Sequence, residues 1–570
     1  MRAALRTKPG ILFSRLLLVV LIGLLGAAGL YLRAPVSVAH ASMAAHAGAT
    51  TGTLAPVAVV DPLRLAPAKA NAPVSSRPKG ARSTRGVHRT SQVSRAPVAV
   101  AANLVAAHPK AGALRQNFNG VGSLDSANTN FGAEFEPPDQ GLCAGNGFVV
   151  DAVNSAFTVY RQNGKVVAGP FNVNQLFAEG MTEFTSDPRC QYDEATHTWF
   201  AIILFINATN TGARTDVAVN TSGDPTTPWT VYHVDATDDG SNGTPSHPGC
   251  PCFGDQPLLG IDQYNLYIST NEFSILGPEF NGAQIYALAK SQLVSRSHAV
   301  HVVHLDNLNI GGAVAASVQP AISNGWPEAE FFLNSLDPNG TGDNRVGVWA
   351  LTDRDAVAKG DVPRLSSLVL TSEAYAIPPG AVQKGATSLL DTGDDRMQQT
   401  EYISGDVWGE LDTAVSISGD TAQRSGAAWF DVHPVVRDGV LAHAALRNQG
   451  YVAVSGSYLL YPALQVNTQG AAAMVVTLSG AGNYPSAAYT VMPGDQRASN
   501  DEGGFGAVII AAPGTGPYDP AATRWGDYSW AILGDDNSVW MATEYIPPVS
   551  SQTTDGLRNW GTRVVEVSLH

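Results

Sequence analysis

The sequence predicts an all-β fold, and three observations lead to this prediction. Short apolar runs rich in β-branched and aromatic residues recur from about residue 116 onward, as in residues 198–208 and 265–273. Clusters of Gly, Asn, Asp and Pro separate these runs, which is typical of strands joined by tight turns. Only 15% of the residues are charged and helical periodicity is nearly absent, so long solvated helices are disfavoured.

The strand runs repeat with a common pattern. Each repeat starts at an anchor residue near Pro or Gly, continues as a strand, turns at Asp or Asn, and returns as an apolar strand. The anchors, 48 to 73 residues apart, are Asp139, Asp187, Asp255, Glu328, Arg396, Tyr461 and Asp527. This near-constant step exceeds the usual blade length of about 40–50 residues, and it predicts a single β-propeller with long loops. We expect about seven four-stranded blades, with six or eight as the alternatives because the registers at Glu328 and Arg396 are the least defined.

The two ends of the predicted domain, residues 113–570, supply the strands that close it. The run ALRQNFNGV at residues 113–121 is expected to pair with TRVVEVSL at residues 562–569. Stacking the blades around an axis buries sheet faces that a single four-stranded sheet leaves open. Pairing of the first and last strands would therefore hold the ring closed.

The N-terminus has the features of an export signal. A basic flank precedes an unbroken apolar run at residues 16–32, and small residues near Ala39 and Ala41 offer a cleavage site. Residues 1–41 are therefore predicted to be an apolar helix that acts as a signal peptide or stays as a membrane anchor. Residues 42–112, rich in Ala, Pro and basic residues, are predicted to be a disordered linker.

Charge divides the chain into a basic arm and an acidic body. Residues 1–110 contain 14 of the 34 Lys and Arg residues, whereas 48 of the 49 Asp and Glu residues follow them, all but Asp61. An acidic body repels phosphate, so nucleic acid is disfavoured as a partner. The membrane is expected to contact the protein only through the N-terminal helix, and the predicted location is extracellular, secreted or anchored.

Four cysteines fit an oxidising compartment, and an even number suggests disulfides. Cys250 and Cys252 flank a proline and are predicted to be too close to pair with each other. One is expected to bond Cys143 and the other Cys190, in an order that the sequence leaves open. A zinc site with nearby His247 is the alternative, disfavoured because no second Cys-x-x-Cys motif is present.

Several of these motifs together resemble a known family. EPPDQGLCAGNGFVVDAV, SDPRCQYDEATHTWF, DQPLLGIDQYNLYIST, GAAWFDV and RWGDYSW are similar to segments of a largely uncharacterised family of secreted bacterial β-propeller proteins, often described as sialidase-like. The resemblance covers roughly residues 116–570. It implies a propeller and an extracellular setting, and it implies no settled activity.

One hairpin resembles the Asp-box of sialidase propellers. In SGDPTTPWTVY, Asp224 follows Ser222 by two residues and Trp229 follows Asp224 by five. The resemblance implies that Ser222 and Asp224 brace the turn while Trp229 packs into the sheet. Pro225 departs from the usual pattern, and the motif supports the fold and not a reaction.

Four anchors predict a polar ring at the mouth of the channel. Asp139, Asp187, Asp255 and Asp527 begin equivalent strands, so their carboxylates should lie at one end of the axis. Converging carboxylates and turn carbonyls are suitable ligands for Ca²⁺, the one cofactor considered. The simpler interpretation is that each Asp caps a turn by accepting a hydrogen bond from a nearby backbone N–H.

A sialidase-like reaction would need an arginine cluster, a tyrosine nucleophile and a carboxylate. The weak catalytic candidates are Arg396, Glu401 and Tyr461, and Arg189, Arg524 and Tyr528 are possible companions. Residues beside blade anchors more often cap strands and fill gaps, so these candidates are not preferred. The leading hypothesis is a binding or scaffold module for cell-surface glycan or protein. A sialidase-like or other glycoside hydrolase acting at the central mouth is the alternative.

Overall fold

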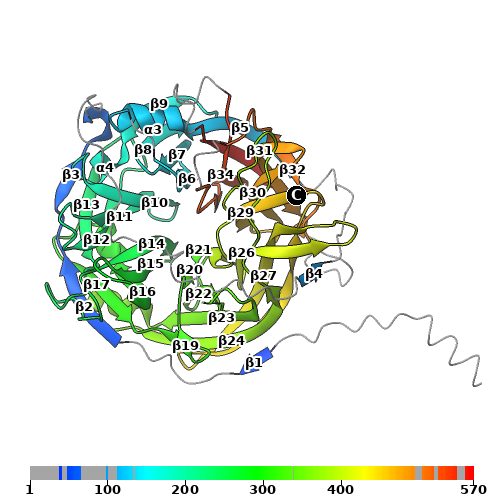
Figure 1. The fold of residues 1–570 in the computed structure, drawn as a ribbon. Helices are drawn as coiled ribbons and strands as arrows, with labels where there is room; N and C mark the ends of the chain where they lie inside the picture. The colour runs from blue at the N-terminus through cyan, green and yellow to red at the C-terminus, as the bar shows by residue number, and fades with distance from the viewer. Residues whose placement is uncertain are drawn as a thin grey trace, which may run out of the picture. The chain divides into compact units, whose positions relative to one another are not determined.

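The computed structural model describes residues 38–40, 48–65, 98–100, 112–132, 135–337, 339–494, 504–518, 524–548 and 559–569. The unit Val38–His570 is an all-β propeller whose sheets follow one another around a common axis (Figure 1). The predicted apolar helix before Val38 lies outside the described residues. Among the residues that are described, no helix has both the length and the hydropathy of a membrane span.

Five sheets in the described part of the chain have four or five strands each. The first contains β6 (Gly141–Gly145), β7 (Phe148–Val153), β8 (Ala156–Arg161) and β9 (Val166–Asn172). The second contains β10 (Phe184–Asp193), β11 (Thr198–Ile206), β12 (Ala213–Asn220), β13 (Trp229–Asp235) and β3 (Ala58–Val60). The third contains β20 (Gln319–Pro320), β22 (Glu330–Ser335), β23 (Asp343–Thr352) and β24 (Arg364–Tyr375). The fourth contains β29 (Ser457–Val466), β30 (Ala472–Gly480), β31 (Asn483–Met492) and β32 (Ile509–Ala512). The fifth contains β33 (Trp530–Leu533), β34 (Val539–Tyr545), β35 (Gly561–Leu569) and β5 (Gly112–Gly122).

A 12-stranded sheet contains two further runs of four antiparallel strands. One run is β14 (Cys252–Ile261), β15 (Asn265–Ser274), β16 (Phe280–Ala289) and β17 (Val300–Asp306), with β2 (Gly48–Leu54) at its edge. The other is β25 (Met397–Ile403), β26 (Asp406–Ile417), β27 (Gln423–Arg437) and β28 (Val440–Val452), joined by β1 (Val38–His40) and β4 (Val98–Val100). The short strand β21 (Ile322–Asn324) pairs in parallel with both β14 and β25. The prediction of about seven separate blade sheets is therefore wrong in its count, because β21 fuses two runs into one sheet.

The remaining elements are short. A two-stranded sheet is formed by β18 (Asn309–Ile310) and β19 (Ala313–Val314). The helices are α3 (Ser123–Thr129), α4 (Val173–Leu176), α5 (Lys290–Val294), η1 (Pro62–Arg64) and η2 (Arg354–Lys359). Large side chains fill the spaces between the sheets: nine of the ten tryptophans are almost fully buried, whereas Trp326 is 82% exposed.

Part of the segment predicted to be a disordered linker is ordered, which corrects the prediction for residues 48–65. β2 pairs antiparallel with β17 from Gly48 opposite Asp306 to Leu54 opposite Val300, and β3 pairs with β13. The outermost strands of two neighbouring units offer unpaired backbone N–H and C=O groups, and an extended segment satisfies them. The segment has no aromatic residue and no regular apolar period, which concealed this pairing from the sequence.

The predicted closure of the ring is confirmed. β5 pairs antiparallel with β35, from Gly112 opposite Leu569 to Gly122 opposite Gly561. Gly120 is required at this seam, because a Cβ on it would lie 2.1 Å from Oδ2 of Asp151 in the neighbouring sheet. That oxygen accepts hydrogen bonds from the Val121 backbone N–H at 2.8 Å and the Thr562 hydroxyl at 2.6 Å. One buried carboxyl therefore connects the first strand, the last strand and β7.

Stability should depend on pH through this carboxyl. Burial raises the pKa of Asp151 to about 7. Its contribution to stability is therefore complete below its ordinary pKa and is lost as the pH rises through about 7. Between pH 5 and pH 7 we expect the wild type to lose about 2–3 kcal/mol relative to Asp151→Asn. Urea unfolding of both proteins across this range measures the difference.

An exposed substitution, Asp361→Asn, serves as the control and should follow the wild-type pH profile. Asparagine at position 151 keeps an oxygen that can accept hydrogen bonds from the Val121 N–H and the Thr562 hydroxyl. Because the amide does not titrate, its effect on stability is the same at every pH in this range. A pH-independent difference between Asp151→Asn and the wild type would contradict the prediction.

The Asp-box-like hairpin joins β12 to β13 and braces the turn as the resemblance implies. The Ser222 hydroxyl accepts a hydrogen bond from the Asp224 N–H at 3.1 Å, and Asp224 Oδ1 accepts from Thr226 N–H at 2.9 Å. Trp229 is 2% exposed, and its indole N–H donates to the Pro225 carbonyl at 2.9 Å. The motif therefore stabilises a blade and supplies no catalytic group.

Two disulfides are present, but their connectivity differs from the prediction. Cys143 on β6 bonds Cys190 on β10, which links the inner strands of two adjacent sheets, and Cys250 bonds Cys252. The latter Cα atoms are 4.4 Å apart, at the short end of the range that a disulfide spans. The prediction that residues so close in sequence do not pair is wrong, because the chain around Pro251 brings them within bonding distance.

Candidate binding site at the channel mouth

A cavity of about 500 Å³, open to solvent, lies where the inner strands begin. All four Asp residues of the predicted ring line it: Asp139, Asp187, Asp255 and Asp527. The remaining lining residues are Ser186, Gln256, Gly393, Asp394, Arg396, Gln398, Tyr461, Arg524 and Tyr528. Residues from several parts of the chain between Asp139 and Tyr528 thus converge on one polar mouth.

A local backbone feature turns these side chains toward the axis. Asp187, Gln256 and Tyr461 each precede a proline and adopt a positive φ, of 59°, 54° and 49°. In each of their strands the pairing register shifts at this point, as between Ser186 and Arg189 in β10. Such a bulge re-aims one side chain out of the ladder, so a repeated bulge gives a ring of side chains.

The third sheet departs from the predicted register. Its inner strand is β20, and Ser317 just before it has a φ of 46°. The predicted anchor Glu328 instead precedes β22, the second strand of that sheet, and does not line the cavity. Pro320 follows Ser317 by three residues, whereas in β10, β14 and β29 the proline directly follows the residue with positive φ. The sequence pattern therefore did not identify Ser317 as the equivalent residue.

Asp139 is the most perturbed carboxyl of the mouth. It is 3% exposed, and burial followed by the charges of Asp527 and Asp187 raises its pKa well above the ordinary value. Its Oδ2 accepts a hydrogen bond from Asn154 Nδ2 at 2.6 Å, while Oδ1 is buried without a hydrogen-bond partner among the described residues. Beside these acidic neighbours the neutral form of Asp139 is therefore favoured more than in an ordinary Asp.

The other carboxylates bond mainly to side chains. Asp187 accepts hydrogen bonds from the Ser186 hydroxyl at 2.7 Å and the Tyr528 hydroxyl at 3.3 Å. Asp527 pairs with Arg524. For Asp187 and Asp527 these contacts are therefore with side chains, and not with the backbone N–H of a turn.

Both arginines of the mouth are engaged by carboxylates near them in sequence. Arg396 donates from Nε to Asp394 Oδ1 at 2.6 Å and from Nη2 to Asp394 Oδ2, and its Nη1 bonds Gln256. Burial opposes its charge, but Asp394 raises the pKa of Arg396 further above its ordinary value. Arg524 pairs with Asp527. Each guanidinium is thus paired with at least one carboxylate, although Arg524 Nε is buried without a hydrogen-bond partner among the described residues.

The predicted catalytic candidates are only partly brought together. Arg396 and Tyr461 line the cavity, whereas Glu401 lies further along β25 and does not. The Glu401 carboxylate accepts a hydrogen bond from Gln399 Nε2 at 2.6 Å, and burial raises its pKa well above the ordinary value. Arg189 does not line the cavity either, but its guanidinium carbon lies behind the lining, 3.5 Å from the centre of the Tyr528 ring. An Arg–Tyr–Glu constellation of the sialidase type is therefore absent from the residues lining this cavity.

Two lining residues were not predicted from the sequence, Gln256 on β14 and Asp394 in the loop before β25, and both contact Arg396. The dipeptide Gln256-Pro257 matches Asp187-Pro188 and Tyr461-Pro462, so a search for the residue before proline would have found Gln256. Asp394 follows a Gly-rich turn and has no comparable signal.

Comparison with known proteins gives only distant similarities. No family model and no curated protein matches the chain. An α-L-arabinofuranosidase of Fusarium graminearum, solved with arabinobiose, is 8% identical, with 80% of this chain and 98% of that chain covered and a TM-score of 0.34. An exo-β-1,3-galactanase from Clostridium thermocellum is 13% identical over 79% and 96% of the two chains, with a TM-score of 0.25. Drosophila Semaphorin 1b, extracellular domains 1–2, is 9% identical over 81% and 88%, with a TM-score of 0.34. Neither a shared activity nor a shared ligand follows from likeness at this level.

Proposed function

We propose that this protein is an extracellular binding module whose channel mouth binds a neutral glycan. Five Asp and only two Arg residues line the cavity, and both arginines are already paired with carboxylates. This observation carries the proposal, because a mouth of this charge repels an acidic sugar and offers many acceptors to sugar hydroxyls.

A Ca²⁺ ion is an optional part of this proposal. The carboxylates of Asp139 and Asp187 offer the oxygen donors that this cation prefers. The acidic loop at residues 235–243 is less suited, because Asp235 and Asp239 accept hydrogen bonds from Thr237 and Ser241 of the same loop. Binding should therefore be measured both with calcium and with a chelator.

The test is calorimetric titration of the full chain with neutral and sialylated oligosaccharides. Neutral ligands should bind, and Asp187→Asn should weaken binding about tenfold, because hydrogen bonds to a charged acceptor contribute about 1.5–3 kcal/mol. The exposed substitution Asp361→Asn should leave binding unchanged. Preferential binding of sialylated ligands would contradict the proposal.

One further variant locates the site. Trp326 is 82% exposed and follows β21, which pairs with the end of β14 remote from Asp255. An exposed indole is a good stacking platform for a sugar ring. If Trp326→Ala abolishes binding and Asp187→Asn does not, the glycan binds at the opposite end of the inner strands and the mouth is not the site.

A glycoside hydrolase is the second candidate, and the raised pKa of Asp139 beside other carboxyls favours it. The raised pKa of Asp139 suits a general acid, and Asp187 and Asp527 lie close enough to perturb it. A panel of fluorogenic neutral glycosides tests this activity. Turnover by the wild type that Asp139→Asn abolishes would establish the enzyme, and no turnover with retained binding would establish the binding module.

A further inference from the structure

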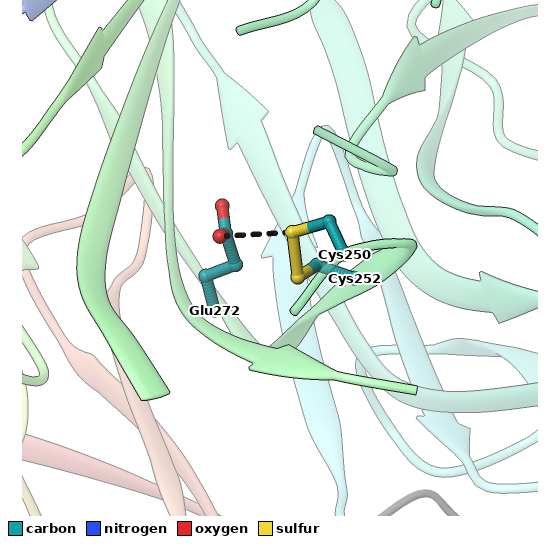
Figure 2. A group of neighbouring side chains, drawn as sticks. All are labelled: Cys250, Cys252 and Glu272. Carbon is teal, nitrogen blue, oxygen red and sulfur yellow. Dashed lines mark hydrogen bonds between the residues drawn. A yellow bond between two sulfur atoms is a disulfide. The ribbon is translucent and has the colours of Figure 1, made fainter. Parts of the chain in front are cut away.

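A second polar cluster lies away from the cavity, around the disulfide Cys250–Cys252 (Figure 2). The Glu272 carboxylate on β15 lies at its centre, with Oε1 3.5 Å from Cys250 Sγ and 2.9 Å from His247 Nδ1. On the other side of the imidazole, His247 Nε2 lies 3.1 Å from Asp306 Oδ2 on β17. Two sulfurs, one imidazole and two carboxylates therefore meet at one place.

These donors are close enough to share one ion. The ligand atoms of Cys250, Cys252 and Glu272 all lie within 4.8 Å of one another, and so do those of Asp238, His247 and Glu272. A tetrahedral zinc with Zn–S bonds of about 2.3 Å and Zn–O bonds of about 2.0 Å holds its sulfur and oxygen ligands about 3.5 Å apart. The distance between Cys250 Sγ and Glu272 Oε1 already has that value.

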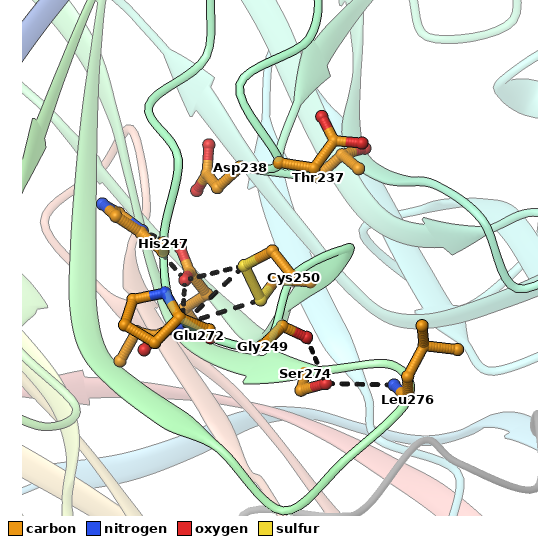
Figure 3. The surroundings of a disulfide bond; sticks show 12 residues. Thr237, Asp238, His247, Gly249, Cys250, Glu272, Ser274 and Leu276 are labelled. Carbon is orange, nitrogen blue, oxygen red and sulfur yellow. Dashed lines mark hydrogen bonds and ion pairs between the residues drawn. A yellow bond between two sulfur atoms is a disulfide. The ribbon is translucent and has the colours of Figure 1, made fainter.

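The carboxyl of Asp238 adds oxygen donors to the cluster. Asp238 is 0% exposed, and neither of its oxygens has a hydrogen-bond partner in the described part of the chain. His304 Nδ1 lies 3.9 Å from Asp238 Oδ1, but burial lowers the pKa of His304 to about 4. Figure 3 shows Asp238 beside His247 and Glu272. Asp238 is therefore placed to act as a further oxygen donor beside Glu272.

A comparable cluster elsewhere already contains its cation. Glu179, Asp216 and His233 also lie within ligand distance of one another, but Arg214 forms salt bridges with both carboxylates. No Lys or Arg forms a salt bridge with Asp238, Glu272 or Asp306 among the described residues. The basic residue of the cluster at Glu272 is instead His247, which lies 2.9 Å from Glu272 and 3.1 Å from Asp306, so the carboxyls of Asp238, Glu272 and Asp306 share one imidazole.

The surroundings also suit thiolates and a metal-bound imidazole. Asn281 Nδ2 lies 3.6 Å from Cys252 Sγ and 3.8 Å from Cys250 Sγ, so it can donate to sulfur anions. The Asp306 carboxylate on His247 Nε2 matches the carboxylate–histidine pairing that orients metal-bound imidazoles. The Ser274 hydroxyl donates to the Gly249 carbonyl at 2.6 Å and accepts from the Leu276 N–H at 3.1 Å, which fixes the loop before Cys250 (Figure 3).

We propose that Cys250, Cys252, His247 and Glu272 form a redox-gated Zn²⁺ site, closed in the disulfide form and open in the dithiol form. A dithiol reductant opens it: the Sγ–Sγ bond breaks, two electrons and two protons pass to the cysteines, and the reductant becomes a disulfide. Zn²⁺ then replaces the two thiol protons. Asp306 acts as a positioning residue through His247. Cys250 is partly exposed and provides the point of attack, whereas Cys252 is buried.

The test uses the full chain with Co²⁺ as a spectroscopic substitute for Zn²⁺. After reduction by a dithiol and removal of the reductant, one Co²⁺ per chain should bind and show thiolate-to-cobalt charge-transfer absorption. The air-oxidised protein should show neither. Zn²⁺ should displace the cobalt stoichiometrically.

Variants assign the ligands. Asp306→Asn should weaken Zn²⁺ binding by about 10- to 100-fold, because the imidazole of His247 loses the carboxylate that orients it. The control is Glu279→Gln, an exposed substitution in the turn between β15 and β16, which should match the wild type. The double variant Cys250→Ser/Cys252→Ser should lose the charge-transfer band. The proposal is overturned if the reduced wild type binds no Co²⁺, if bound Co²⁺ shows no charge-transfer band, or if the double variant retains that band.

Discussion

Replacing Asp262 with alanine should lower the free energy of unfolding by about 3–5 kcal/mol, because it leaves a buried guanidinium without its carboxylate. Asp262 Oδ2 lies 2.5 Å from Arg354 Nη1, and the two side chains are 0% and 5% exposed. Arg354 Nη2 also donates to the Pro327 carbonyl at 2.6 Å. The pair links the β14–β15 turn to η2, which belongs to the next sheet, so its loss weakens the contact between two units of the ring.

The same carboxylate organises the turn itself. Asp262 Oδ1 accepts hydrogen bonds from the backbone N–H groups of Tyr264 at 2.7 Å and Asn265 at 2.8 Å, and Oδ2 accepts from the Tyr267 hydroxyl at 3.0 Å. Asp262→Asn keeps a neutral acceptor for the turn and should cost less than alanine. Urea unfolding followed by tryptophan fluorescence measures both variants.

A surface ion pair provides the matched control. Asp355 and Lys359 form a pair at 2.6 Å on η2, but their side chains are 58% and 63% exposed. Asp355→Ala should leave the unfolding midpoint nearly unchanged, because water already solvates both charges. Equal losses for Asp262→Ala and Asp355→Ala would show that the buried pair has no special role.

The second large effect is expected from the disulfide between Cys143 and Cys190. Removing it with Cys143→Ala/Cys190→Ala should cost about 4 kcal/mol of stability, because the bond closes a loop across 47 residues of the unfolded chain. Both cysteines are buried, at 0% and 2% exposed, within a core shared by adjacent sheets. Thermal and urea unfolding of the double variant against the wild type measure the loss.

The Cys250–Cys252 bond provides the comparison within the same chain. Its sequence separation is 2, so the same loop-entropy model gives only about 1–2 kcal/mol. Cys250→Ala/Cys252→Ala should therefore unfold much closer to the wild type. If the two double variants lose equal stability, loop length does not decide the contribution and the short disulfide is structural.

Much of the fold could be predicted from sequence because blades repeat. Several inner strands contain a bulge that turns one side chain toward the axis, and a proline directly after Asp187 and Tyr461 marks this bulge in the sequence. The closing pair of β5 and β35 was predictable because both ends of the domain alternate as strands and no other partner remains. The fusion by β21 was not, because three residues contributing a few main-chain bonds leave no composition signal.

The site was predictable in position and much less in chemistry. Equivalent anchors placed Asp139 and Asp527 in one mouth, but whether an arginine binds a ligand or a neighbouring Asp depends on side-chain packing. The cluster around Glu272 was missed because its members come from a loop and from strands β15 and β17, and no spacing rule joins them. The sequence analysis named His247 only as the histidine near Cys250 in the alternative zinc site.

The segment formed by β2 and β3 has a consequence for how copies of this protein meet. Outer strands of blades carry rows of unused amide and carbonyl groups, and such rows recruit strands from other molecules during aggregation. At β13 and β17 the chain's own N-terminal portion occupies those rows. Intermolecular strand addition is therefore blocked at two neighbouring rim positions for as long as residues 48–65 stay attached to the domain.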